Sequence, residues 1–246
     1  EDANHNIWIG TNGFGLIRHS PSTGVFERMP HNRAVVPAGS AHIQALLFDV
    51  RQGLWVASET GIALIDTADG HPLRSLSFGG DDDASRTRVR QLRVTADGTL
   101  WAATSTGLWR LAPQTDALQR VDANRIASAY ALLVEHDGEL AVATADGVYR
   151  INATGADERI WPLDGDQMVN AMAQDNHGRL WLAIPHQGLA LVDLASGGAT
   201  QWLKPISGMA GSLPDAIVTQ LEIDQSGLLW IGTIERGLVK VDPNGT

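Results

Sequence analysis

The sequence predicts an all-β protein, a β-propeller built from four-stranded antiparallel blades. Three observations predict it. A phrase of five residues, usually centred on tryptophan, recurs six times; a glycine and a second apolar run follow each copy; and successive copies lie 40 to 49 residues apart. Periods of about 40–50 residues are typical of propeller blades and of helical repeats such as HEAT, so the local pattern has to decide between these classes.

The local pattern favours strands. Two short β-prone runs joined by a few polar residues ending in glycine predict a β-hairpin, because glycine accepts a positive φ at the turn. A helical repeat would need apolar residues three and four apart over ten or more positions, and these runs are too short. The six copies are Ile7–Thr11, Leu54–Ser58, Leu100–Thr104, Leu140–Thr144, Leu180–Ile184 and Leu229–Thr233, and the second runs begin at Gly15, Gly61, Gly107, Gly147, Gly188 and Gly237.

Two further strands complete each unit. An alternating run such as Val218–Asp224 precedes the tryptophan phrase, and a turn such as Pro21–Gly24 leads to a short edge strand, Val25–Arg28. Four strands in each period make one blade. We therefore expect about six blades, four complete near residues 42–78, 87–122, 129–163 and 168–203, and two partial near residues 6–30 and 216–243.

The register of the repeat predicts one propeller domain over residues 1–246 that is a fragment of a longer, seven-bladed propeller. The first blade lacks an inner strand and the last lacks an outer one. A closed propeller normally completes its last blade with a strand from the other terminus, which removes free edges. The alternative to a fragment is a strained six-bladed ring. Open blade edges predict that the fragment self-associates or is only marginally stable as a monomer.

An acidic residue or threonine stands six residues before the tryptophan position in every copy. Asp next to a glycine turn predicts backbone capping, in which the carboxylate accepts local N–H groups, and this reading is favoured over a catalytic one. A large flat side chain at one position per blade predicts packing between blades, favoured over an array of ligand-binding tryptophans. The residues assigned these structural roles are Asp49, Asp175, Asp224, Trp8, Trp55, Trp101, Trp181 and Trp230.

Composition excludes several classes of partner. The 246 residues carry a formal net charge of -10 and no cysteine, so disulfides and thiolate metal sites are excluded. The acidic balance disfavours nucleic acid and anionic membrane surfaces, which would repel it. No window of about 18 apolar residues exists, so we expect no membrane contact by this segment. The N-terminus lacks a basic start followed by an apolar run, so a signal peptide is expected to be absent or already removed.

The phrase Gly227–Thr233, followed by Gly237–Pro243, resembles the two-component regulator propeller repeat, and so does Ile7–Thr11 with its following turn. The third, fourth and fifth copies depart from the pattern, for example at Ala141 and Ile184. The resemblance implies a periplasmic sensor region of a bacterial receptor, with a histidine kinase or diguanylate cyclase elsewhere in the parent and no enzyme activity in this fragment. Streptogramin lyases share the Asp-x-x-Gly-x-Leu-Trp phrasing, so a metal-assisted lyase is the alternative.

Variation in blade length places the candidate site. The longer periods add residues mainly at Pro30–Ala41, Gly79–Arg86 and Lys204–Ala216, between an outer strand and the next inner strand. Loops on a rigid scaffold are where binding residues tend to lie. We expect an unknown small molecule, a saccharide in some members of the resembled family, or a protein subunit to bind there. The candidate ligand-binding residues are His31, Arg33, Asp81, Asp82, Asp83, Arg86, Lys204 and Met209.

The sequence predicts no catalytic residue, metal site or cofactor. Asp81–Asp83 is a solvated acidic loop in the favoured reading, since three adjacent carboxylates cannot all reach one calcium ion and no Asp-x-Asn-x-Asp spacing is present. The eight histidines are scattered without the spacing of a zinc site. There is no Gly-x-Ser-x-Gly elbow, phosphate loop or dinucleotide fingerprint.

Overall fold

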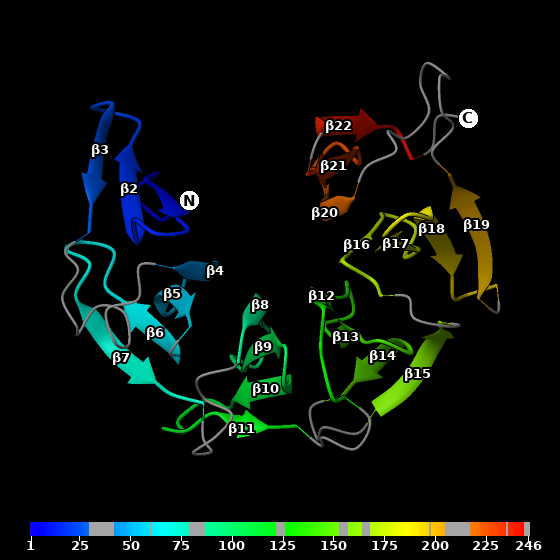
Figure 1. Ribbon diagram of the computed structural model, residues 1–246, viewed down its shortest axis with the longest axis horizontal. Helices are drawn as coiled ribbons and strands as arrows, with labels where there is room; N and C mark the ends of the chain where they lie inside the picture. Colours follow the sequence, from blue (N-terminus) through cyan, green and yellow to red (C-terminus); the bar gives the residue numbers. More distant parts are fainter. Residues whose placement is uncertain are drawn as a thin grey trace. The chain divides into compact units, whose positions relative to one another are not determined.

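The computed structural model describes residues 1–29, 42–59, 61–78, 87–121, 126–152, 157–163, 168–196, 198–204, 217–234 and 236–243. In these ranges every regular element is a β-strand. The strands form six antiparallel sheets, and within each sheet neighbouring strands are consecutive in the sequence (Figure 1). Four sheets have four strands and the first and last have three. The predicted all-β class and four-stranded blades are confirmed, and no described helix could cross a membrane.

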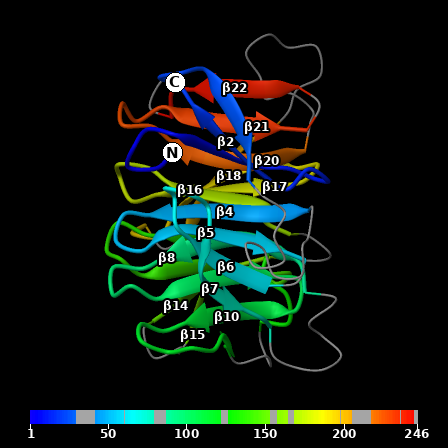
Figure 2. The same cartoon turned by 90° about the vertical axis from the view of Figure 1, so that its left-hand side faces the viewer.

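The chain divides into two compact units, Glu1–Ser128 and Ala129–Thr246, so a single domain over the whole chain stays a prediction. The first unit holds three sheets. Their strands are β1 (Ile7–Gly10), β2 (Leu16–Ser20) and β3 (Val25–Arg28); β4 (Ile43–Asp49), β5 (Gly53–Ser58), β6 (Gly61–Ile65) and β7 (Pro72–Leu76); and β8 (Val89–Val94), β9 (Leu100–Thr104), β10 (Gly107–Leu111) and β11 (Gln119–Arg120). Figure 2 shows the second sheet, β4 to β7, with its strands side by side.

The second unit holds the other three sheets. The fourth and fifth copies, which depart from the repeat pattern, still form the expected hairpins there, as the third copy does in the first unit. The strands are β12 (Ala131–Val134), β13 (Leu140–Ala143), β14 (Gly147–Ile151) and β15 (Asp157–Pro162); β16 (Ala171–Gln174), β17 (Leu180–Ile184), β18 (Gly188–Asp193) and β19 (Ala199–Leu203); and β20 (Val218–Ile223), β21 (Leu229–Thr233) and β22 (Gly237–Val241).

Every sheet has two unlike faces, because side chains alternate along a strand. The face that carries the repeated tryptophan position is named the Trp face. The opposite face, which carries the residues immediately before and after that position in the strand, is named the Leu face. Four contacts between neighbouring sheets within the units have one pattern: the Trp face of a sheet packs on the Leu face of the next sheet. Trp55 and Ile62 pack on Leu100 and Ala102 in this way, and the same pattern joins the first sheet to the second, the fourth to the fifth and the fifth to the sixth.

In the first, fifth and sixth sheets the aspartate before the tryptophan accepts the indole N–H as well as backbone N–H groups of its turn. In the second sheet Asp49 accepts the backbone N–H of Arg51 at 2.8 Å, whereas the Trp55 indole N–H has no hydrogen-bond partner among the described residues. The Asp2 carboxylate accepts the backbone N–H of Asn4 (2.9 Å) and the indole N–H of Trp8 (2.8 Å). Although burial acts to raise it, these hydrogen bonds hold the pKa of Asp2 below its ordinary value. Asp175 with Trp181 and Asp224 with Trp230 repeat the arrangement, at 3.3 and 2.8 Å. The spacing of six residues thus lets one carboxylate serve both the backbone and the indole.

The last residue of the repeated phrase is usually threonine because its hydroxyl fastens the hairpin turn. The Thr104 hydroxyl donates to the Gly107 carbonyl at 2.7 Å, and the Thr144 hydroxyl donates to the Gly147 carbonyl at 2.9 Å. Thr11, Ser58 and Thr233 make the equivalent bond. Ile184 has no hydroxyl, so the turn of the fifth sheet lacks it.

Candidate functional site

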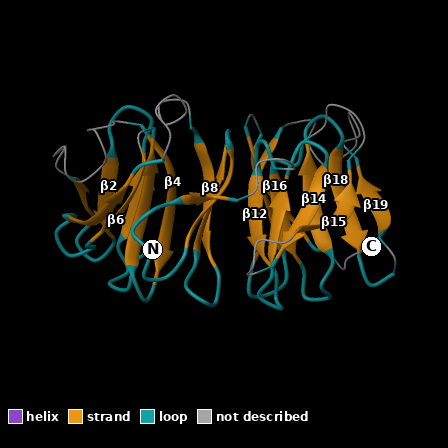
Figure 3. Ribbon diagram, turned by 90° about the horizontal axis from the view of Figure 1, so that it is seen from below, coloured by secondary structure: helices purple, strands orange, loops and turns teal. Residues whose placement is uncertain are grey.

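The antiparallel strand order fixes where the long connections lie. In each sheet the hairpin turn joins the second strand of the repeat to the third, and the fourth strand runs antiparallel to the third. The fourth strand therefore ends where the hairpin turn lies, and the next sheet begins at that end. We name this the loop end of a sheet; it carries turns such as β5–β6 and β17–β18. Figure 3 shows that the turns gather at the two ends of the strands.

Most of the predicted ligand-binding residues lie outside the described residues. These are His31, Arg33, Asp81, Asp82, Asp83, Arg86 and Met209. Lys204 is described, and it is exposed where β19 reaches the loop end of the fifth sheet. Its role in binding stays a prediction.

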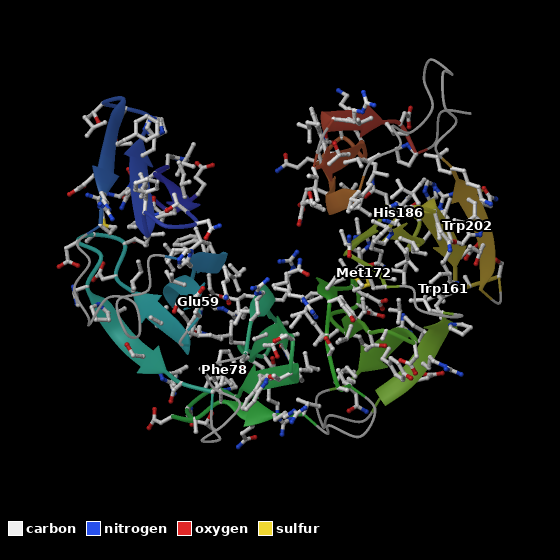
Figure 4. All side chains as sticks on the ribbon, viewed as in Figure 1. Glu59, Phe78, Trp161, Met172, His186 and Trp202 are labelled. Carbon is white, nitrogen blue, oxygen red and sulfur yellow. The ribbon has the colours of Figure 1, made fainter. Side chains whose placement is uncertain are left out.

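Lys204 has an aromatic neighbour that the sequence analysis did not single out. Its Nζ lies 5.9 Å from the ring centroid of Trp202, within the range of a cation–π contact. Trp202 is 38 % exposed, whereas Trp161 on β15 is 9 % exposed and donates its indole N–H to the Thr200 hydroxyl (Figure 4). An exposed indole beside an ammonium group presents a flat apolar surface and a donor together, a combination suited to polar molecules with apolar faces.

In the first unit, polar side chains meet where the chain enters the second and third sheets. Asn12 in the β1–β2 turn forms an isolated bridge with His42, and their side chains are hydrogen-bonded. Thr87 bonds to Thr106 at 3.0 Å, linking the start of the third sheet to its hairpin turn. The Arg90 guanidinium donates to the Ser128 hydroxyl at 2.8 Å. Sequence reasoning missed these groups; for Arg90 alone, a polar position on the inner strand β8 was a signal that could have found it.

The fourth sheet has its own polar cluster at its loop end. The Asp146 carboxylate accepts hydrogen bonds from the hydroxyls of Tyr149 and Thr144, both at 2.7 Å, and Arg159 lies 3.8 Å away. Burial acts to raise the pKa of Asp146, but the hydrogen bonds outweigh it and the net shift is downward. Asp146 is therefore held as a carboxylate, which suits it to accept hydrogen bonds and disfavours a role as a general acid.

Two groups of possible metal ligands occur among the described residues, and both lie at the opposite end of their sheets. One is Asp66, Asp69 and His71 in the β6–β7 turn; the other is Glu135, Asp137 and Glu139 in the β12–β13 turn. The first contains a hydrogen bond between the His71 ring and the Asp69 carboxylate, and the second contains the bond from Arg150 to Glu135, both at 2.5 Å. Neither group adds a ligand to the loop end.

Comparisons with solved structures settle the fold. The chain is similar to the extracellular domain of BT3049 of B. thetaiotaomicron, described as a hybrid two-component system, with a TM-score of 0.75 and 19% identity over 96% of this chain and 32% of that one. It is also similar to PorZ of Porphyromonas gingivalis, a surface component of the type-IX secretion system (TM-score 0.74, 21% identity, 98% of this chain and 37% of that one). The fold is a β-propeller.

The resemblance to two-component regulator propellers thus holds at the level of the fold, and this chain spans about a third of the length of those two structures. Virginiamycin B lyase of Staphylococcus aureus has the same fold, with a TM-score of 0.73 and 13% identity over 100% of this chain and 83% of that one. No family model matches the sequence, and no curated protein matches it.

Proposed function

We propose that this β-propeller is the sensing or interaction part of an extracytoplasmic region of a bacterial receptor of the two-component or diguanylate cyclase type. The observation that carries the proposal is the fold, which the chain shares over 96% of its length with the extracellular domain of a hybrid two-component system. The tandem sequence repeats, which resemble the two-component regulator propeller repeat, support it. Periplasmic location, a seven-bladed parent and a kinase or cyclase output belong to the same proposal.

The loop end is the binding surface in this proposal. In the second unit, Trp202 and Lys204 at the loop end of the fifth sheet supply a flat apolar face and an ammonium donor. A saccharide suits this chemistry, because its hydroxyls need donors and acceptors while its C–H faces pack on an aromatic ring. The predicted loop residues remain proposed contacts: His31, Arg33, Asp81, Asp82, Asp83, Arg86 and Met209.

A lyase activity is not favoured. The identity to virginiamycin B lyase is 13%, lower than the 19% and 21% found for the two surface proteins. In the described part of the chain, the acid and histidine groups close enough to share a metal ion lie at the end of the sheets opposite the loop end. A propeller lyase acting at the loop end would need its acid/base pair and metal there.

Replacement of Trp202 by alanine is expected to weaken saccharide binding about tenfold or more, because the exposed indole provides the packing surface. Binding is measured by calorimetric titration of the unchanged chain with a panel of neutral and acidic oligosaccharides. The oligosaccharide that binds most tightly is then titrated into the variant. Phe26→Ala is the control, since Phe26 is an exposed aromatic residue (65 %) on the edge strand β3 of the first sheet. Equal affinities of the Trp202 variant and the unchanged chain would show that Trp202 is not part of the binding site. Absence of binding by every saccharide tested would contradict a saccharide ligand.

A further inference from the structure

A cavity of about 280 Å³ lies between the fourth and fifth sheets, both of which belong to the second unit. Part of its wall comes from the start of β15 and part from the β18–β19 turn, so it lies at the end of the sheets opposite the loop end. Ile160 and Leu194 also pack on the apolar core between these two sheets. The residues that line the cavity are Arg150, Glu158, Arg159, Ile160, Leu194 and Gly198.

The first and second sheets show what the equivalent position holds when the repeat is intact. Arg18 on β2 lies opposite Glu27 on β3, and its guanidinium donates to the Glu27 carboxylate at 2.6 Å. The same guanidinium donates to the backbone carbonyls of Thr67 and Ala68 in the β6–β7 turn of the next sheet, at 3.1 and 2.9 Å. One carboxylate and two turn carbonyls therefore bind a guanidinium group, which the chain supplies from its own Arg18.

Between the fourth and fifth sheets the equivalent arginine bonds elsewhere. Arg150 holds the register position of Arg18, opposite Glu158. Its guanidinium donates to Glu135 at 2.5 Å and lies 3.0 Å from Glu139, and both of these carboxylates belong to the β12–β13 turn of its own sheet. Glu158 is exposed, and it has no hydrogen-bond or ion-pair partner among the described residues.

The turn of the fifth sheet keeps the backbone acceptors. The β6–β7 and β18–β19 turns begin alike, with an aspartate that accepts the backbone N–H of the second residue after it, Ala68 at 2.7 Å and Ala195 at 3.0 Å. The carbonyls of Leu194 and Ala195 therefore hold the places of those of Thr67 and Ala68. The described bonds of Arg150 do not reach this turn.

The charges around the cavity favour a cation. Arg150 already has two carboxylates beside it, and Arg159 lies 3.8 Å from the Asp146 carboxylate. The Glu158 carboxylate therefore adds a negative charge that neither arginine compensates. A cation on an apolar stem suits this arrangement, because the charge can pair with the carboxylate while the stem packs on the apolar part of the wall.

We propose that this cavity binds a guanidinium group, with the Glu158 carboxylate as its anionic partner and the carbonyls of Leu194 and Ala195 as further acceptors. The bound group takes the place that Arg18 fills between the first and second sheets. A planar guanidinium can donate to a carboxylate and to two carbonyls at once, whereas an ammonium group donates from a single point, so arginine fits the site better than lysine. The site lies at the other end of the sheets from the proposed saccharide surface and does not depend on it.

Titration with N-acetyl-arginine amide tests the proposal by nuclear magnetic resonance of the chain with labelled isoleucine methyl groups. Ile160 lines the cavity, so its methyl signal reports occupancy. We expect a saturable shift with a Kd of about 1–10 mM, because a single exposed charge pair supplies little affinity. Glu158→Gln is expected to raise the Kd about tenfold, since it removes the charge-assisted hydrogen bonds. Glu158 has no partner in the described structure, so the fold is preserved.

Glu27→Gln is the matched control. Glu27 holds the equivalent register position beside a cavity of about 390 Å³, but Arg18 is already its partner. The Ile160 titration of this variant is expected to match that of the unchanged chain. An Ile160 signal that does not shift up to about 100 mM ligand would overturn the proposal, and so would an unchanged Kd in the Glu158 variant.

Two further ligands identify the source of the group. Tighter binding of the capped amide than of free L-arginine would assign the site to an arginine side chain of a peptide or protein, and the reverse order would assign it to a free small molecule. N-acetyl-lysine amide is expected to bind several-fold more weakly than its arginine counterpart. Equal binding of the lysine and arginine amides would overturn the guanidinium assignment.

Discussion

A chain with methionine in place of Arg150 is expected to lose about 3–5 kcal/mol of its free energy of unfolding at pH 8, the typical cost of leaving one member of a buried ion pair without its partner. Arg150 donates to the Glu135 carboxylate at 2.5 Å, and the Glu135 side chain is only 1 % exposed. Its second oxygen has no hydrogen-bond partner in the described structure. Removing the guanidinium would leave a buried carboxylate with no opposite charge beside it.

This pair exists because the fourth copy of the repeat has lost its tryptophan. Trp8 lies opposite Arg18 across the first hairpin, and the guanidinium lies over the indole at 5.8 Å. In the fourth sheet Ala141 takes the tryptophan position opposite Arg150. Without an indole below it, the guanidinium reaches the residue that replaces the turn aspartate, Glu135. The two departures from the repeat therefore compensate each other.

The loss should depend on pH. Burial raises the pKa of Glu135, with Arg150 opposing the rise, so removing Arg150 raises that pKa further. Above the unfolded value of about 4.3 the folded state then holds a proton that the unfolded chain has released, so stability falls as pH rises towards the folded pKa. Urea denaturation should show a smaller loss at pH 5 than at pH 8. The double change Glu135→Gln and Arg150→Met should recover most of the lost free energy of unfolding. A loss below about 1 kcal/mol at both pH values for Arg150→Met would contradict the assignment of Glu135 and Arg150 as a buried ion pair.

Replacement of Gly61 by alanine is expected to cost about 3 kcal/mol or more, from backbone strain and steric overlap together. Gly61 begins β6 with a φ of +155°, and a Cβ there would lie 2.1 Å from the backbone carbonyl oxygen of Leu76 on β7. That oxygen belongs to the paired neighbouring strand, so it cannot move away without breaking the edge of the sheet. The free energy of unfolding in urea measures the cost.

Gly138→Ala is the matched control for this substitution. Gly138 also has a positive φ, +90°, but a Cβ there would have no neighbour within 4 Å. Its expected cost is only that of the left-handed backbone, about 1 kcal/mol. Similar costs at the two positions would show that strain at the hairpin comes from φ alone and that the contact with β7 contributes nothing.

The strands could be predicted because the repeat places the same chemistry at the same position six times. The spacing from Asp2 to Trp8 or from Asp224 to Trp230 pointed to a capped turn, and the structure adds that the same carboxylate receives the indole N–H. The replacement of the aspartate–tryptophan pair by Glu135 and Arg150 in the fourth sheet could not be predicted. It depends on an arginine one strand away, and arginine at that position stacks on an indole in the first sheet.

The candidate site was predicted less completely than the strands. Lys204 was chosen for its place in a long connection, but Trp202 beside it read as an ordinary strand residue, because alternation does not show that its ring is left uncovered.

Sequencing the parent gene on both sides of these codons tests the central claim most directly, since the proposed function rests on a receptor context. The account predicts further repeats of the Leu-Trp-Ile-Gly-Thr kind, then an apolar stretch of about 20 residues able to cross a membrane and a histidine kinase or diguanylate cyclase domain. A stop codon soon after Thr246 with at most one repeat upstream would contradict it, and would indicate a free-standing propeller.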